Sequence, residues 1–216
     1  AQTDRNGKIG VLFSKLINWM SNTKNNLFRK ILEIFVNIDK RVRLPKYNSE
    51  TFANYFKNNV KKIGLGRNSE RKVVIYSTCF VNFNKKNTGV AALKVLKKNG
   101  VEVEHAYPGC CGMPFLEQAD LPKVVEQAKK VSTDLLKWVD KGYDVVTLTA
   151  SCGLMLKFEW PLLLPNDTNV KKLSQHIFDI DEYVVDISNK EGLADGLQEI
   201  DGGVTVHNAC HARAQN

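Results

Sequence analysis

The sequence predicts an α/β fold: a doubly wound, mostly parallel sheet preceded by a helical, basic N-terminal arm. From Lys72 onwards, short apolar runs typical of strands alternate with amphipathic stretches of helical spacing, a pattern that favours a parallel sheet covered by helices. Before Lys72 the apolar residues recur every three or four positions among many Lys and Arg. The chain of 216 residues is 43% hydrophobic, which is enough for a core and excludes a disordered protein.

The arm is the basic part of the chain. Residues 1–72 carry 16 Lys and Arg against 5 Asp and Glu, whereas residues 73–216 carry 15 against 18. Apolar stripes within residues 8–38, interrupted at 21–26, predict two amphipathic helices. They are interpreted either as an interfacial pair that contacts a membrane or a partner, or as helices that pack on a further N-terminal part of the same protein. No run of 18 apolar residues occurs, so no spanning helix is expected.

Residues 39–71 are basic and irregular and are interpreted as a linker. Within them, Phe52, Tyr55 and Phe56 predict a short aromatic helix. The glycines of this segment are too sparse for a phosphate-binding loop. The basic charge is explained either by a second functional region or by a solvated linker.

The remaining elements follow in alternation. Strands are predicted at 72–77, 101–106, 144–149 and 203–206, and helices at 88–98, 121–141, 152–161 and most of 168–189. Such an order predicts that each strand lies parallel to the others, with its carboxyl end at the same edge of the sheet.

Each cysteine follows one of these predicted strands. Cys79 follows the first strand, Cys110 and Cys111 the second, Cys152 the third and Cys210 the fourth. Ligand sites of open α/β sheets form at the carboxyl ends of the strands. We therefore expect Cys79, Cys110, Cys111 and Cys152 to form one redox or metal-binding site.

The residues around the cysteines favour an inorganic cluster. Gly109 and Gly112 flank the cysteine pair, so the backbone can approach a bulky group. Cys152-Gly153 lies at a strand-to-helix turn, where helix N–H groups favour the thiolate that metals bind. Four thiolates suit a [4Fe–4S] cluster or zinc, although local C-x-x-C pairs typical of structural zinc are absent from the sequence. A third interpretation is that the cysteines are small buried core residues.

Cysteine count and histidine positions add two expectations. Five cysteines, two of them adjacent, do not fit a disulfide framework, so a reducing compartment is expected. His105 is expected to be a core or surface residue, and His176 has no assigned role. His207 and His211 flank Cys210, which suggests a metal or redox role for that cluster.

Four motifs together resemble the cysteine-rich CCG domain family. They are Cys79-Phe80-Val81-Asn82, Gly109-Cys110-Cys111-Gly112-Met113-Pro114, Ser151-Cys152-Gly153 with Glu159-Trp160-Pro161, and His207-Asn208-Ala209-Cys210-His211. The family includes subunits of heterodisulfide reductase and of anaerobic glycerol-3-phosphate dehydrogenase, iron–sulfur subunits of glycolate oxidase, and lactate-utilisation proteins. The similarity covers about residues 72–216.

The resemblance implies a domain organisation. Residues 1–71 would be an arm that follows a ferredoxin-type domain outside this sequence, 72–202 a first CCG domain, and 203–216 the start of a truncated second one. Met155 stands where the family usually has a last cysteine, so the resemblance implies a four-cysteine cluster and not a five-cysteine noncubane one. Cys210 matches the opening cysteine of the second copy and is expected to be cofactor-binding there.

The resemblance also implies a function. The chain would be an iron–sulfur electron-transfer subunit of a membrane-associated dehydrogenase, with FAD on a partner flavoprotein that oxidises glycerol phosphate or a 2-hydroxy acid. Electrons would pass to a quinone, and the protein would lie on the cytoplasmic face of the cell membrane, without a nucleic-acid partner. Two alternatives are thiol/disulfide reduction at the cluster, as in heterodisulfide reductase, and a non-enzymatic zinc or degenerate module that binds partners.

Overall fold

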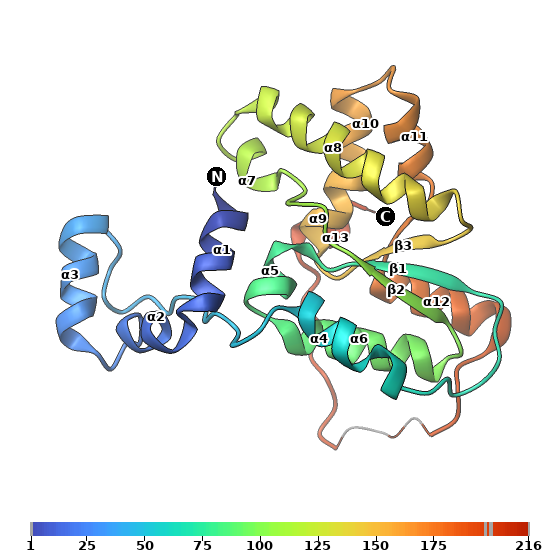
Figure 1. Cartoon of the computed structure of the whole chain (residues 1–216), viewed down its shortest axis with the longest axis horizontal. Helices are drawn as coiled ribbons and strands as arrows, with labels where there is room; N and C mark the ends of the chain where they lie inside the picture. Colours follow the sequence, from blue (N-terminus) through green and yellow to red (C-terminus); the bar gives the residue numbers. More distant parts are fainter. Residues whose placement is uncertain (1, 197, 199–200, 216) are drawn as a thin grey trace.

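The computed structural model describes residues 2–196, 198 and 201–215. Its centre is a sheet of parallel strands in the order β2-β1-β3-β4. The strands are β1 (Lys72–Tyr76), β2 (Glu102–Ala106), β3 (Asp144–Thr147) and β4 (Ile177–Asp179). Helices cover both faces of this sheet (Figure 1), so the predicted α/β fold is confirmed.

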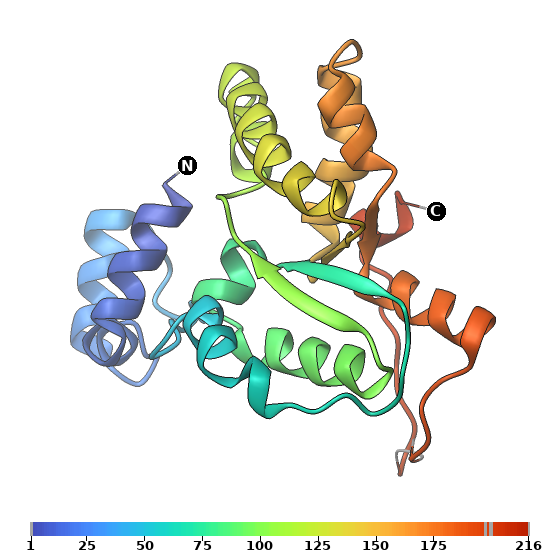
Figure 2. The same cartoon turned by 45° about the vertical axis from the view of Figure 1, so that its right-hand side comes forward.

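The two faces of the sheet carry separate layers of the core. Val73 and Ile75 of β1 point to one face and Val74 and Tyr76 to the other, as the two-residue period of a strand requires. The first face is covered by α4 (Phe52–Asn59), α6 (Lys86–Lys98) and α12 (Ile180–Glu191), and the second by α8 (Leu121–Val139), α10 (Trp160–Leu163) and α11 (Thr168–Ser174). Figure 2 shows the sheet between these layers.

The predicted fourth strand at 203–206 is wrong. Residues 203–209 belong to no strand, and Val204 and Val206 are exposed. The place beside β3 is taken by Ile177–Asp179, inside the stretch predicted as mostly helical. That stretch is broken because Asp179 and Glu182 form a capping box that starts a new helix, α12.

The arm contains three helices among the described residues instead of the two expected: α1 (Thr3–Leu12), α2 (Ser14–Met20) and α3 (Asn26–Val36). One side of α1 packs on the body, where Gly7 faces the ring of Phe83 and Gly10 that of Tyr47. Phe83 belongs to α5 (Thr78–Phe83), which follows β1. In both views α3 lies on the far side of α1 from the sheet (Figures 1 and 2).

Many apolar side chains of the arm face solvent. They are Ile9, Leu12, Phe13, Leu16, Trp19, Leu27, Ile31, Ile34, Phe35 and Val36. The α/β body therefore leaves many apolar side chains of the arm uncovered, although one side of α1 packs on it. Within the part of the chain that the structure describes, no helix combines the length and apolar composition needed to cross a bilayer.

Residues 39–71 contribute to the core as well as joining the arm to it. The predicted aromatic helix is α4, and its Phe52 is fully buried against the sheet layer that contains Val73 and Ile75. Arg29 of α3 is also fully buried and donates hydrogen bonds to the carbonyls of residues 39, 40 and 42. These bonds fix the path of the chain after the arm.

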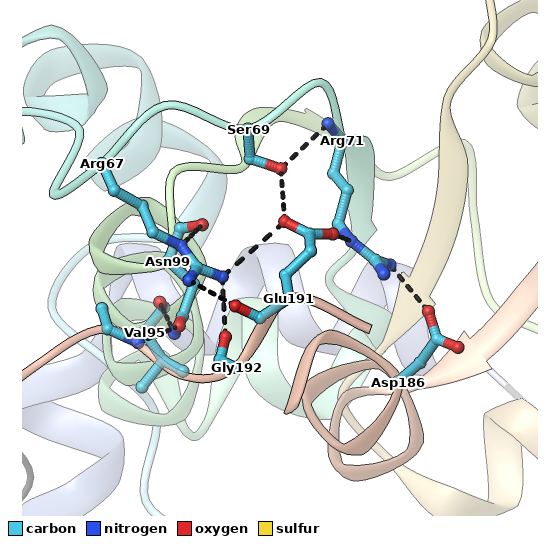
Figure 3. Close-up of polar contacts among 9 residues, drawn as sticks. Arg67, Ser69, Arg71, Val95, Asn99, Asp186, Glu191 and Gly192 are labelled. Atoms are coloured by element: carbon cyan, nitrogen blue, oxygen red, sulfur yellow. Dashed lines mark hydrogen bonds and ion pairs between the residues drawn. The ribbon is translucent and has the colours of Figure 1, made fainter. Parts of the chain in front are cut away.

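A group of ion pairs ties the entrance of β1 to the end of α12 (Figure 3). Arg71 pairs with Asp186 at 2.8 Å and with Glu191, and its guanidinium lies over the ring of Tyr183. Arg67 donates to the carbonyl of Gly192 at 2.8 Å. This network lies at the amino end of β1, opposite the carboxyl ends of the strands that the cysteines follow.

Candidate metal centre

The carboxyl ends of β1 and β3 position the first and last cysteines. Cys79 lies in the first turn of α5, directly after β1, and Cys152 lies in α9 (Ala150–Leu154), directly after β3. The strands β1 and β3 are neighbours, and the chain leaves β1 towards β2 on one side and β3 towards β4 on the other. The two cysteines therefore flank the topological switch point, where α/β sheets commonly form their ligand sites.

The cysteine pair reaches the same point from the far side of β1. Cys110 and Cys111 lie in the turn between β2 and α7 (Met113–Leu116). The Cys111 thiol lies 3.2 Å from the sulfur of Cys152, and the thiols of Cys79 and Cys111 both hydrogen-bond to Cys110. The four side chains thus form a continuous series in the order 79, 110, 111 and 152, as the topology predicted. Cys210 is not among them.

This group of four, the cysteine cluster, is shielded from solvent. Cys110 is 3% exposed, Cys111 2% and Cys152 5%, and Cys79 is half-buried. Beside Cys79, a cavity of about 240 Å³ opens between α1 and α5. Cys79 is therefore the member of the cluster nearest to solvent.

Hydrogen bonds within the cysteine cluster shift the pKa values of its thiols in opposite directions. Hydrogen bonds from Cys111 and Cys79, then from the Gly112 N–H and the Thr3 side chain, lower the pKa of Cys110. The pKa values of Cys79 and Cys111 are raised, first because their thiols donate to Cys110 and then because both are buried. These hydrogen bonds therefore stabilise negative charge on the sulfur of Cys110 more than on the sulfurs of Cys79 and Cys111.

The donor chemistry of the cluster fits a thiophilic metal. Deprotonating all four sulfurs would place like charges together in a buried site, and a metal cation or an iron–sulfur core compensates such charge. The sulfurs contact one another in series, and among the described residues no group of three or more His, Cys, Asp or Glu side chains has a preformed metal-binding arrangement.

Two buried hydrogen bonds hold the backbone of the cysteine pair. The Tyr76 hydroxyl donates to the carbonyl of Gly109 at 2.7 Å, and Trp160 Nε1 donates to the carbonyl of Cys111 at 3.0 Å. Sequence reasoning did not assign a role to either aromatic residue. The signal in the sequence was Trp160 itself, a buried indole next to Pro161 in one of the motifs, because a buried indole N–H needs an acceptor.

The arm contributes one wall of the cluster. Besides the Thr3 hydrogen bond to Cys110, Asp4 accepts a hydrogen bond from the Tyr107 hydroxyl. Tyr107 stacks on Tyr76 with ring centroids 6.3 Å apart. Contacts between residues a hundred positions apart leave no local pattern, and the sequence did not predict these.

Strained backbone lies directly before Cys79. Thr78 is buried and has a φ of 58°, a conformation that costs energy for a β-branched residue. Its hydroxyl lies 3.2 Å from that of Thr149, which precedes α9. This hydroxyl pair links the two turns that carry Cys79 and Cys152.

The remaining candidate residues lie elsewhere. Cys210 is exposed at the start of α13 (Cys210–Arg213), and within the described residues no hydrogen bond joins it to the cysteine cluster. His207 is exposed and His211 half-buried. His105 is half-buried, packs against two phenylalanine rings and lies 3.0 Å from the Ser77 hydroxyl. His176 precedes β4 and lies 3.3 Å from Asp144.

Hydrogen bonds of Gln215 connect the last described helix to the turn that carries Cys152. Gln215 donates to the carbonyl of Ala150 at 2.9 Å and to Asp179 at 2.8 Å. A Cβ at Gly153 would lie 2.5 Å from Asp179 and 2.8 Å from Gln215. A side chain here, directly after Cys152, would have to displace these polar groups.

Comparison with known proteins finds one matching family model and several relatives. The model of the CCG family, described as a cysteine-rich domain, matches residues 73–157. Lactate utilization protein A of Macrococcus caseolyticus is 29% identical over 145 residues, which cover 65% of this chain and 56% of that protein. The corresponding protein of Bacillus pumilus is 30% identical over 145 residues, with 65% and 58% covered.

A third relative matches more of this chain. It is a subunit of the anaerobic glycerol-3-phosphate dehydrogenase of Escherichia coli, 28% identical over 179 residues, which cover 82% of this chain and 43% of that protein. The chain thus spans about half the length of the curated relatives it matches. No solved structure matches significantly. The segment that matches the model of the CCG cysteine-rich domain, residues 73–157, contains all four residues of the cysteine cluster.

Proposed function

We propose that this chain is an iron–sulfur electron-transfer subunit of a dehydrogenase. The observation that carries the proposal is the meeting of Cys79, Cys110, Cys111 and Cys152 at the switch point of the sheet. These four thiolates would hold a [4Fe–4S] cluster, which supplies one-electron transfer when bound. The relatives support the proposal, because two kinds are named for lactate utilization and for anaerobic glycerol-3-phosphate dehydrogenase.

The protein's own residues would set the properties of that cluster. Burial of Cys110, Cys111 and Cys152 lowers the local dielectric, and the Gly112 N–H donates to a ligand sulfur. Both features tune the reduction potential of an iron–sulfur group. In this proposal the substrate, glycerol 3-phosphate or a 2-hydroxy acid, is oxidised on a partner flavoprotein that carries FAD.

The experiment that tests the proposal is anaerobic reconstitution with ferrous iron and sulfide. The expected result is about four iron and four sulfide per chain, with a brown colour and an electron paramagnetic resonance signal on reduction. Zinc is the competing occupant because it also accepts four thiolates. A protein that binds zinc tightly and takes up no iron would overturn the proposal and favour a zinc module.

We further propose that the arm attaches the subunit to the cytoplasmic face of a membrane, where electrons pass to a quinone. The exposed apolar residues of α1, α2 and α3 lie in the basic part of the chain, a combination typical of helices that bind anionic lipid surfaces. For the full-length protein, the proposal also includes a second CCG domain that begins at residues 203–216 and a ferredoxin-type domain that precedes the arm. The boundary proposed at residue 202 adjoins residues 197, 199 and 200, which lie outside the described part.

Vesicle binding tests the membrane attachment. Ile34→Glu together with Phe35→Glu should weaken binding to phosphatidylglycerol vesicles by at least about tenfold, because both side chains are largely exposed on α3. The matched control is Val204→Glu with Val206→Glu, two equally exposed residues outside the arm. Binding should also weaken with added salt. Equal binding of both double variants would contradict the attachment.

A further inference from the structure

The peptide between Cys111 and Gly112 is held from both of its sides. On one side, the Cys111 carbonyl accepts the buried hydrogen bond from Trp160 Nε1 at 3.0 Å. On the other side, the Gly112 N–H acts on the sulfur of Cys110 and lowers the pKa of that thiol. The C=O and N–H of a trans peptide point in opposite directions across one rigid plane. A group that fixes the carbonyl therefore fixes the direction of the N–H as well.

Trp160 is built to fix that carbonyl. Its side chain is fully buried at the start of α10, in the same core layer as the cysteines. Pro161 follows it and restricts the backbone there. The indole has a single donor and no acceptor, so Trp160 can bind the carbonyl of Cys111 but cannot compete for the N–H of Gly112.

The rest of the turn agrees with this arrangement. Gly112 has a φ of 92°, which disfavours every residue with a Cβ. The carbonyl of Gly109, two residues before Cys111, accepts a hydrogen bond from the Tyr76 hydroxyl at 2.7 Å. The two peptides on either side of the cysteine pair are thus each anchored by a buried aromatic residue from another element.

We infer that Trp160 is a positioning residue of this site: by binding the Cys111 carbonyl, it aims the Gly112 N–H at the Cys110 sulfur. Where the inference concerns a cluster, it rests on the proposed function. An N–H···S bond stabilises the more negative, reduced form of a bound cluster, so it raises the reduction potential. Trp160 would therefore set the potential without touching the metal.

The test compares two replacements with a matched control. Trp160→Phe removes the donor, and incorporation of benzothienylalanine at position 160 removes the N–H while keeping the size of the ring. Trp138→Phe is the control, because Trp138 packs on Tyr143 before β3, at the edge of the sheet away from the cysteines. In metal-free, reduced protein, the readout is amide hydrogen exchange at Gly112. In reconstituted protein it is the reduction potential.

The expected result is exchange at Gly112 about tenfold faster in both position-160 variants, and a lower potential than in the Trp138→Phe protein. Benzothienylalanine at position 160 separates this effect from general loosening of the core, because it fills the same space. If Gly112 exchange and the potential match those of the control, the inference is overturned. If the unaltered protein takes up no iron, the proposed function fails, while the exchange measurement still decides the role of Trp160.

Discussion

The sulfur of Cys111 lies 3.2 Å from that of Cys152, although 41 positions separate the two residues along the chain. Cys111 belongs to the turn after β2 and Cys152 to the helix after β3. Strand β1 lies between β2 and β3 in the sheet, so the contact bridges over the end of β1. The turns after β2 and β3 therefore meet above the central strand, where Cys79 also lies.

The first prediction concerns Cys111 as a ligand. Cys111→Ser should lower the iron affinity of reconstituted protein by at least about tenfold, because a buried thiolate donor is lost. Far-UV circular dichroism should change little, since the sheet core does not depend on this sulfur. The matched control is Cys210→Ser, because Cys210 is exposed and outside the cysteine cluster. Unchanged iron in the Cys111→Ser protein would argue against its role as a ligand.

The position of the cluster was predictable because parallel topology decides it. Strands at 72–77, 101–106 and 144–149 have continuous apolar runs, and the cysteine after each strand must reach the same edge. The short strand Ile177–Asp179 was missed because three residues between two helices carry almost no periodic signal. The segment 203–206 alternates like a strand, but in the structure no neighbouring strand pairs with it.

The shell around the cysteines was not predictable from the sequence alone. Tyr76 and Trp160 bind carbonyls 33 and 49 positions away, and Tyr107 binds Asp4 103 positions away. Such contacts depend on how the layers pack and not on local spacing. The packing of α1 on the body could not be predicted for the same reason. In the sequence it is marked only by Gly7 and Gly10, which leave room for the rings of Phe83 and Tyr47.

A second prediction concerns the half-buried His105. Burial lowers the pKa of His105 from 6.5 to about 4, so the folded protein keeps it neutral while the unfolded chain binds a proton. Its contribution to stability is complete above pH 6.5 and is lost as the pH falls towards 4, by about 2 kcal/mol at pH 5. His105→Asn should flatten the pH dependence of the unfolding free energy between pH 7 and 5 in metal-free protein. A slope equal to that of the unaltered protein would contradict this.

A third prediction concerns Arg71 in the network of Figure 3. Arg71→Ala should destabilise the fold by about 2 kcal/mol, because the side chain is largely buried and loses two carboxylate partners and the ring of Tyr183. Arg41→Ala is the control: its ion pair with Asp39 is exposed to solvent, so its loss should change the stability much less. Urea unfolding measures both. Equal effects of the two substitutions would exclude a special role for Arg71.

A fourth prediction concerns the docking of α1. A Cβ at Gly7 would lie 2.2 Å from the ring of Phe83, so Gly7→Val should push α1 away from α5 and uncover Cys79. We expect the thiol of Cys79 to react with iodoacetamide at least about fivefold faster and the arm to be cut sooner by protease, as for any segment that opens locally. Gly64→Ala is the control, because a Cβ there meets nothing within 4 Å. Equal alkylation rates in the two variants would show that α1 does not shield the cluster.

The burial of Phe52 has a consequence for how this protein can be divided. Phe52 is 0% exposed, and a Cβ at Gly89 on α6 would lie 2.6 Å from its ring, so the two elements are fitted closely. A polypeptide beginning at Lys72 would contain every strand that the structure describes and all four cysteines of the cluster, yet the apolar face of the sheet that Phe52 covers would be exposed to water. Loss of the buried Phe52 side chain alone would cost about 1.5 to 3 kcal/mol, a sizeable fraction of the stability of an ordinary domain. The smallest autonomous folding unit therefore begins before Thr51, well upstream of the first strand.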